Sequence, residues 1–187
     1  MARSGPGAAR APRGKRRWAP CLVATGAAVA LAGGDGCSDH GAVCGPREAV
    51  VERVIDGDTI VVAGDVKIRY LLVDAPEATT GHADCYGAGA AQFNADLVLG
   101  HTVQLDYDVD CRDRFGRTLA YVTLDGHDVN RLLIERGYAC VLHIPPDGDD
   151  RAGELEALES SARAAGRGLW GACDPIPCHS TRRVDRW

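Results

Sequence analysis

The sequence predicts an α+β fold that is mainly β, a small closed or partly closed barrel of five strands with three helices. Two runs rich in β-branched residues flank the turn dipeptide Asp56-Gly57, and three more runs have strand composition. A helical pattern interrupts the strands after the third. With 187 residues, 45% hydrophobic and 25% charged, the chain is neither disordered, collagen-like nor a coiled coil.

Five strands are predicted, and the first two form a hairpin around Asp56-Gly57. The dipeptide Gly64-Asp65 leads into the third strand, and Pro76 follows its end. The predicted strands cover residues 49–55, 59–62, 66–73, 101–109 and 118–124.

Three helices are predicted from apolar residues that recur every three or four positions, as Ala90, Phe93 and Leu97 do. Glycines follow each pattern and are typical helix ends. The predicted helices cover residues 88–100, 128–136 and 150–165.

The first 32 residues have the pattern of a secretory signal peptide. Six basic residues precede an apolar run of 12 residues at 21–32, which ends in Ala30-Leu31-Ala32. Because a membrane-spanning helix needs about 20 apolar residues, the run predicts no stable membrane span. We expect a protein that is secreted, periplasmic or on the cell surface, with an uncleaved signal anchor as the alternative.

The rest of the chain divides into a Gly/Cys-rich tether at 33–48, a domain at 49–171 and a tail at 172–187. Without residues 1–32, which contain no acidic residue, the formal charge is −11. Because strong binding to nucleic acid normally needs surplus Lys and Arg, three possibilities remain. The protein concentrates its arginines locally, uses metal ions, or does not bind polyanions.

Seven cysteines follow residue 32, and their spacing matches no zinc motif. With an export signal, this favours disulfides formed in an oxidising compartment. Because seven is odd, either Cys37 is left over, with lipid modification as one option, or another thiol stays free. The seven are Cys37, Cys44, Cys85, Cys111, Cys140, Cys173 and Cys178.

Four carboxylates, those of Asp56, Asp58, Asp74 and Glu77, lie at the hairpin turn and just beyond the third strand, where barrel loops can converge. Oxygen ligands of this kind suit Ca²⁺ or Mg²⁺. Taken singly, each can also be an ordinary turn or solvated loop residue.

Two arginines accompany these acids. Arg69 interrupts the apolar strand Ile68-Arg69-Tyr70-Leu71-Leu72-Val73, where it needs an anionic partner. Arg117 follows Phe115-Gly116 at a tight turn, which holds it near the backbone. The alternatives are a structural ion pair for Arg69 and a plain turn residue for Arg117.

Five segments in this order resemble the staphylococcal-type thermonuclease family over roughly residues 49–171. They are VIDGDT at 54–59, IRYLLVDAPE at 68–77, YG at 86–87, DRFGRTLAYV at 113–122 and GLW at 168–170. The resemblance implies a five-stranded oligonucleotide/oligosaccharide-binding (OB) barrel with three helices.

The resemblance also implies roles for individual residues. A catalytic Ca²⁺ is bound by the side chains of Asp58 and Asp74 and the carbonyl of Ala75, with Asp56 acting through water. Glu77 matches the carboxylate proposed as general base, and Arg69 and Arg117 match the arginines that hold the scissile phosphate. The residues expected to contact substrate are Arg114, Phe115 and His143.

Three positions depart from the family pattern. Ala75 replaces a threonine, and His143 and Pro145 lie where tyrosines often flank the nucleotide. With the acidic charge, this predicts a preference for single strands or short fragments.

The sequence therefore predicts a secreted, monomeric, Ca²⁺-dependent nuclease that hydrolyses phosphodiester bonds of DNA and RNA and leaves 3′-phosphate products if it follows the family. The alternatives are a catalytically inactive binding module of the same fold and an extracellular Ca²⁺-binding structural domain. We further expect disulfides Cys85–Cys111 and Cys140–Cys173. Because Arg69 and Asp74 are an odd number of residues apart, a bend near Val73 is needed to bring them together.

Overall fold

The structure is a computed structural model that describes residues 44–79, 81 and 83–178. The predicted signal peptide at 1–32, most of the tether including Cys37, and the end of the tail lie outside the described residues. No helix in the part that is described is long and apolar enough to cross a membrane.

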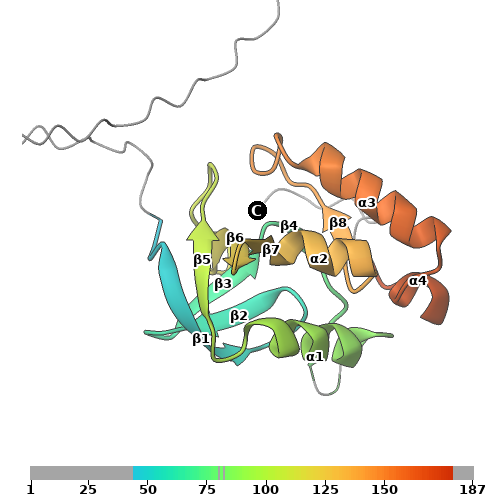
Figure 1. Cartoon of the computed structure of the whole chain (residues 1–187), viewed down its shortest axis with the longest axis horizontal. Helices are drawn as coiled ribbons and strands as arrows, with labels where there is room; N and C mark the ends of the chain where they lie inside the picture. The colour runs from blue at the N-terminus through green and yellow to red at the C-terminus, as the bar shows by residue number, and fades with distance from the viewer. Residues whose placement is uncertain (1–43, 80, 82, 179–187) are drawn as a thin grey trace, which may run out of the picture. The chain divides into compact units, whose positions relative to one another are not determined.

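The centre of the fold is a closed barrel of five strands (Figure 1). Strands β1, β2 and β3 form an antiparallel meander, and β5 pairs with both β1 and β6. A parallel pairing of β3 with β6 closes the ring, so the predicted barrel is confirmed. The five strands are β1 (Glu48–Val54), β2 (Thr59–Val62), β3 (Val66–Tyr70), β5 (Thr102–Asp106) and β6 (Thr118–Leu124).

Three helices accompany the barrel where the sequence predicts them, each within two residues of the expected ends. They are α1 (Gly87–Val98), α2 (Val129–Arg136) and α3 (Ala152–Ala164). The sequence analysis missed three short elements, β7 (His127–Asp128), β8 (Cys140–Leu142) and α4 (Leu169–Ala172).

The barrel interior is the hydrophobic core. Ile60, Ile68 and Val122 are fully buried there, and Leu105 and Leu119 are 1% exposed. Helix α2 adds Leu133 and Ile134 to the same core, since both lie on the helix face turned away from solvent. Burial of each such side chain stabilises the fold by roughly 1.5–3 kcal/mol.

The third strand does not run unbroken over residues 66–73, and that prediction is wrong. Leu72 adopts a φ of 60°, which ends β3 at Tyr70 and starts a new strand, β4 (Leu72–Asp74), that pairs with β8. This is the bend that the separation of Arg69 and Asp74 requires. The bend is at Leu72, one residue before Val73.

Asn130 of α2 holds this bend in place. Its Nδ2 donates to the carbonyl of Leu71 over 2.8 Å, and its Oδ1 accepts from the Val122 backbone N–H over 2.9 Å. Gly148 leaves room for the Leu72 side chain, because a Cβ there would lie 2.4 Å from Leu72 Cδ2. The direction in which β4 leaves the barrel therefore depends on residues far away in the sequence.

The predicted disulfides Cys85–Cys111 and Cys140–Cys173 are wrong. Cys111 pairs instead with Cys44. The segment before β1 lies against the end of β5 and the residue that follows it, since Leu105 N donates to the Arg47 carbonyl and Tyr107 Oη donates to the Pro46 carbonyl.

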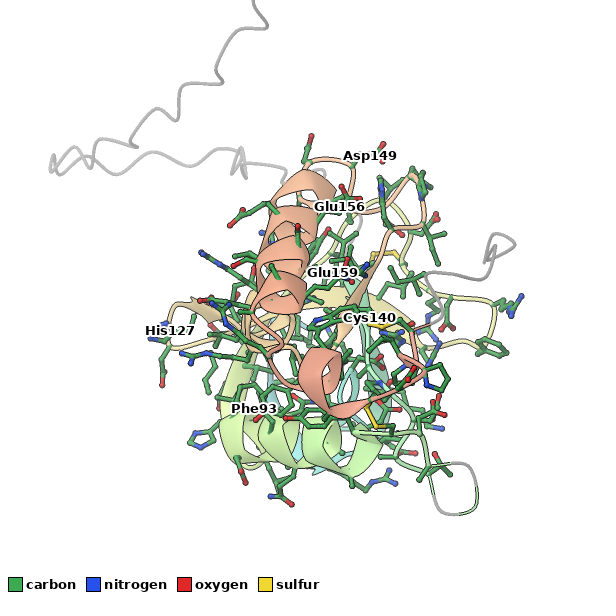
Figure 2. All side chains as sticks on the ribbon, turned by 90° about the vertical axis from the view of Figure 1, so that its right-hand side faces the viewer. Phe93, His127, Cys140, Asp149, Glu156 and Glu159 are labelled. Atoms are coloured by element: carbon green, nitrogen blue, oxygen red, sulfur yellow. A yellow bond between two sulfur atoms is a disulfide. The ribbon has the colours of Figure 1, made fainter. Side chains whose placement is uncertain are left out.

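The other two disulfides, Cys85–Cys173 and Cys140–Cys178, lie around α4. Helix α4 brings Cys173 to the beginning of α1, and the tail then returns to β8, where Cys140 is fully buried (Figure 2). The sequence analysis did not predict α4, and so it could not predict these partners.

We predict that Asn130→Ala lowers the free energy of unfolding by at least about 2 kcal/mol. The substitution leaves the buried Leu71 carbonyl and the Val122 N–H without their partner, and each costs about 1–3 kcal/mol. Urea denaturation measures the loss. Arg131→Ala, on the solvent side of the same helix, is the control and should stay within about 0.5 kcal/mol of wild type. Equal stability of the two variants would contradict this role of Asn130.

Candidate active site

The side chain of Arg69 lies between two buried carboxylates at the bend after β3. Its Nη2 is 3.1 Å from Asp58 Oδ2 and 3.7 Å from Asp74 Oδ1. Its Nη1 donates to the carbonyls of Tyr70, over 3.0 Å, and Val73. All three charged side chains are less than 10% exposed. The anionic partners that the apolar strand requires for Arg69 are therefore Asp58 and Asp74.

Local hydrogen bonds fix the orientation of the Asp58 carboxylate. Oδ1 accepts from Thr59 Oγ1 over 2.9 Å, and Oδ2 accepts from the backbone N–H of Ala75 over 2.7 Å. The second bond joins the hairpin turn to the end of β4, so Asp58, Asp74 and Ala75 meet at one place.

Asp56 is the third buried carboxylate of this group, 8% exposed. Its Oδ1 accepts from the Asp58 N–H over 3.0 Å, and its carbonyl accepts from Asn94 of α1, which is itself bonded to Tyr70 Oη. Burial, and then the neighbouring Asp58 charge, raise the pKa of Asp56 to about 7.

This group, which we call the acidic cluster, consists of Asp56, Asp58 and Asp74 and has a donor set that suits a hard cation. Its side chains offer only oxygen, and the negative charge exceeds that of the Arg69 guanidinium. Within residues 44–79, 81 and 83–178, no three His, Cys, Asp or Glu side chains converge closely enough to hold a metal ion. Asp58 and Asp74 would therefore bind a cation together with the Ala75 carbonyl, water and substrate oxygens, as Ca²⁺ and Mg²⁺ sites often do.

Glu77 lies on the loop that leaves β4, and its side chain is exposed. Its backbone is anchored to Asp84, whose Oδ2 accepts from the Glu77 N–H and whose N–H donates to the Glu77 carbonyl. Gly87 packs directly on that carbonyl, since a Cβ at Gly87 would lie 2.0 Å from it. The start of α1 thus fixes the backbone of Glu77, while Thr79 contacts the carboxylate over 3.4 Å.

Arg117 is held by the turn that precedes β6. Its Nε donates to Asp113 Oδ2 over 2.6 Å, and its side chain is 24% exposed. Phe115, 66% exposed, lies beside it, with Arg114 on the same ring at 4.8 Å. Arg114, Phe115 and Arg117 therefore occupy one turn, and the prediction that Arg117 is held near the backbone is confirmed.

His143 directly follows β8, whose Leu142 pairs with Leu72 of β4. Its Nε2 is 2.9 Å from Asp149 Oδ1, on the turn before α3 (Figure 2). The structure thus brings together Asp56, Asp58, Arg69, Asp74 and Ala75, gathers Arg114, Phe115 and Arg117 at a turn, and places His143 in contact with an acid.

The sequence analysis missed Asp113, which is buried and orients the Arg117 turn. Its Oδ1 accepts from the N–H groups of Phe115 and Arg117. The signal was present, because Asp at the first position and Gly at the fourth, as in Asp113 to Gly116, are typical of a type I turn. Asn94, which supports Asp56, had no such signal, since its partners are 38 and 24 residues away.

Comparisons with known proteins agree with this geometry. A model of the staphylococcal nuclease homologue family matches residues 67–172. The prophage-derived endonuclease YokF of Bacillus subtilis is 34% identical over 66% of this chain and 44% of its own length. Endonuclease YncB of B. subtilis is 36% identical over 64% of this chain and 60% of its own length. The chain therefore spans less than two thirds of the length of these two relatives.

The thermonuclease of Staphylococcus intermedius is similar over a larger share of its own length. It is 33% identical over 65% of this chain and 74% of its own length. The family match covers the acid at the end of β4, both arginines and the Glu77 loop. This chain therefore belongs to the staphylococcal nuclease homologue family.

Proposed function

We propose that this protein is a Ca²⁺-dependent nuclease that hydrolyses phosphodiester bonds in single-stranded DNA and RNA, with 3′-phosphate products. Membership of the family and the names of the relatives, endonuclease and thermonuclease, support the nuclease activity. The observation that carries the proposal is the buried contact of Arg69 with Asp58 and Asp74 at the end of a strand, with an exposed glutamate, Glu77, three residues further along the chain.

The burial of Arg69 fixes its guanidinium, and the contacts described above leave its Nε–H as the donor for a phosphate. Its Nη1 is bound to two backbone carbonyls and its Nη2 to two carboxylates, so the guanidinium cannot turn freely. Donors fixed before the reaction stabilise the charge that develops on phosphate oxygens better than mobile ones do. Arg117 provides a second guanidinium. Asp113 accepts its Nε–H, so the Nη groups can donate hydrogen bonds to the phosphate.

A divalent cation held by Asp58, Asp74 and the Ala75 carbonyl would supply positive charge at the phosphate. In the hydrolysis, the Glu77 carboxylate takes a proton from a water molecule, whose oxygen bonds to phosphorus. The bond from phosphorus to the 5′ oxygen breaks, and that oxygen takes up a proton from solvent. The backbone of Glu77 is anchored, and its exposed carboxylate, which has a contact of 3.4 Å with Thr79, can still reach a water molecule.

We also propose export from the cytoplasm. Residues 1–32 have the pattern of a signal peptide. The three disulfides support an oxidising location, since such bonds rarely persist in the cytosol.

The direct test is degradation of a labelled single-stranded DNA and a matching RNA by the purified protein. We expect cleavage with Ca²⁺, and its loss with a chelator and return on adding Ca²⁺. End-group analysis should find 3′-phosphates. Binding without cleavage at any divalent metal would instead identify a binding module with the same fold.

We predict that Glu77→Gln lowers kcat by at least about 10²-fold, because the amide cannot accept the proton of the attacking water. Steady-state kinetics on single-stranded DNA measure the loss. Calorimetric Ca²⁺ affinity should stay near wild type. Glu156→Gln, an exposed change on α3, serves as the control (Figure 2). Wild-type turnover in Glu77→Gln would remove Glu77 from the mechanism.

We predict that Arg69→Lys lowers kcat by about 10²-fold or more while the protein still folds. Lysine keeps the positive charge between Asp58 and Asp74 but loses the planar fork that can bind carboxylate and phosphate together. The control is Arg53→Lys, whose side chain is 60% exposed and contacts Asp65. A lower melting temperature with unchanged kcat would assign Arg69 a structural role alone.

A further inference from the structure

A groove of about 220 Å³ lies beside the Arg117 turn, and the proposed function uses only part of it. We call it the β3–β6 groove, because residues at the start of β3 and before and at the start of β6 form its walls. The residues that matter here are Val66, Lys67, Arg112, Phe115, Arg117 and Thr118.

The strand register places this groove one step from Arg69. Side chains two apart on a strand share a face, so Lys67 and Arg69 lie on the same face of β3, about 6.6 Å apart along it. Arg69 pairs with Leu119 of β6, and Arg117 lies two residues before Leu119. Extending the parallel register back by one residue from Ile68 and Thr118 puts Lys67 of β3 opposite Arg117, the residue just before β6.

The groove is positively charged in a protein whose net charge is negative. Lys67 and Arg112 are exposed, and Arg117 lines the same groove. Arg112 Nη1 donates to the carbonyl of Gly116 over 3.3 Å, which steadies its side chain. The carboxylate at the rim, Asp65, is in an ion pair with Arg53 at 3.4 Å, so its charge is partly balanced.

We propose that Lys67 and Arg112 bind a second backbone phosphate of a single-stranded nucleic acid, adjacent to the phosphate that is cleaved. This inference rests on the proposed function, since it extends the substrate path beyond the scissile phosphate. A nucleic acid strand whose scissile phosphate is bound by Arg69 and Arg117 would place its next phosphate in the β3–β6 groove. Lys67 and Arg112 line that groove. The exposed ring of Phe115 forms an apolar wall for the nucleotide between the two phosphates.

The first experiment measures binding without cleavage. A fluorescein-labelled oligothymidylate of ten nucleotides is titrated with the full chain in chelator at several NaCl concentrations, with fluorescence anisotropy as the readout. We expect the double variant Lys67→Gln/Arg112→Gln to bind at least about tenfold more weakly. The slope of log K against log salt should become shallower by about 0.7, because the variant neutralises one phosphate fewer on the single strand. Arg131→Gln, an exposed arginine of α2, should leave the slope unchanged.

The second experiment compares an octanucleotide with a dinucleotide that has a single phosphodiester bond. We expect the double variant to raise KM for the octanucleotide at least about fivefold, with kcat little changed. The kcat/KM for the dinucleotide should equal that of wild type, because a dinucleotide has no second phosphate. Both side chains are exposed, so the melting temperature of the double variant should match wild type.

The outcomes separate the two proposals. If wild type cleaves the octanucleotide but the double variant keeps its KM and salt slope, the subsite is overturned and the nuclease function stands. Equal losses on both substrates would also overturn the subsite, since the two cations would then act at the scissile phosphate. If wild type binds but cleaves nothing, the nuclease function fails. A reduced slope in the double variant would still support the second phosphate contact.

Discussion

The buried guanidinium of Arg69 is the interaction on which the rest of the site depends. A lone charge in a barrel wall is costly, and the chain compensates with two carboxylates and two backbone carbonyls drawn from the hairpin turn, the bend and β4. The β2–β3 pairing already places Asp58 beside Arg69, because Thr59 pairs with Arg69, and the bend then brings Asp74 of β4 to the same guanidinium. The same arrangement that makes the Arg69 charge tolerable creates a buried group with more negative than positive charge, which is an environment that a divalent cation stabilises.

The bend at Leu71 and Leu72 links this electrostatic requirement to the architecture. A straight strand would send Asp74 to the face opposite Arg69. The left-handed backbone of Leu72 is unfavourable for a leucine and persists because Asn130 and the β4–β8 pairing hold both sides of it. The strained backbone of Leu72 is thus part of the bend that brings Asp74 to Arg69.

Much of the barrel could be predicted from the sequence, because turn dipeptides and apolar periodicity are local signals. The helix ends followed from glycines, and an arginine inside an apolar strand pointed to a buried ion pair. What failed depended on contacts between distant segments. The break after Tyr70 is imposed partly by Asn130 and β8, and the partners of Cys85 and Cys140 depend on α4, a single turn with little periodicity. The turn pattern Asp113 to Gly116 indicates that Asp113 orients the Arg117 turn. The contacts of Asn94 with Asp56 and Tyr70 join distant segments and can be seen only in the fold.

The strand pair that closes the barrel has consequences for how the molecule assembles. Ile68 meets Thr118 across the β3–β6 seam, and Cys85 is joined to a partner 88 residues further along the chain. Such long-range contacts form late, since loop-closure entropy must be overcome before they contribute any stability. The ring can therefore shut only after β6 (Thr118–Leu124) has been synthesised. Arg69 acquires its β6 neighbour Leu119 at this step, whereas the position of Asp74 on β4 depends on segments made later still, Asn130 and β8.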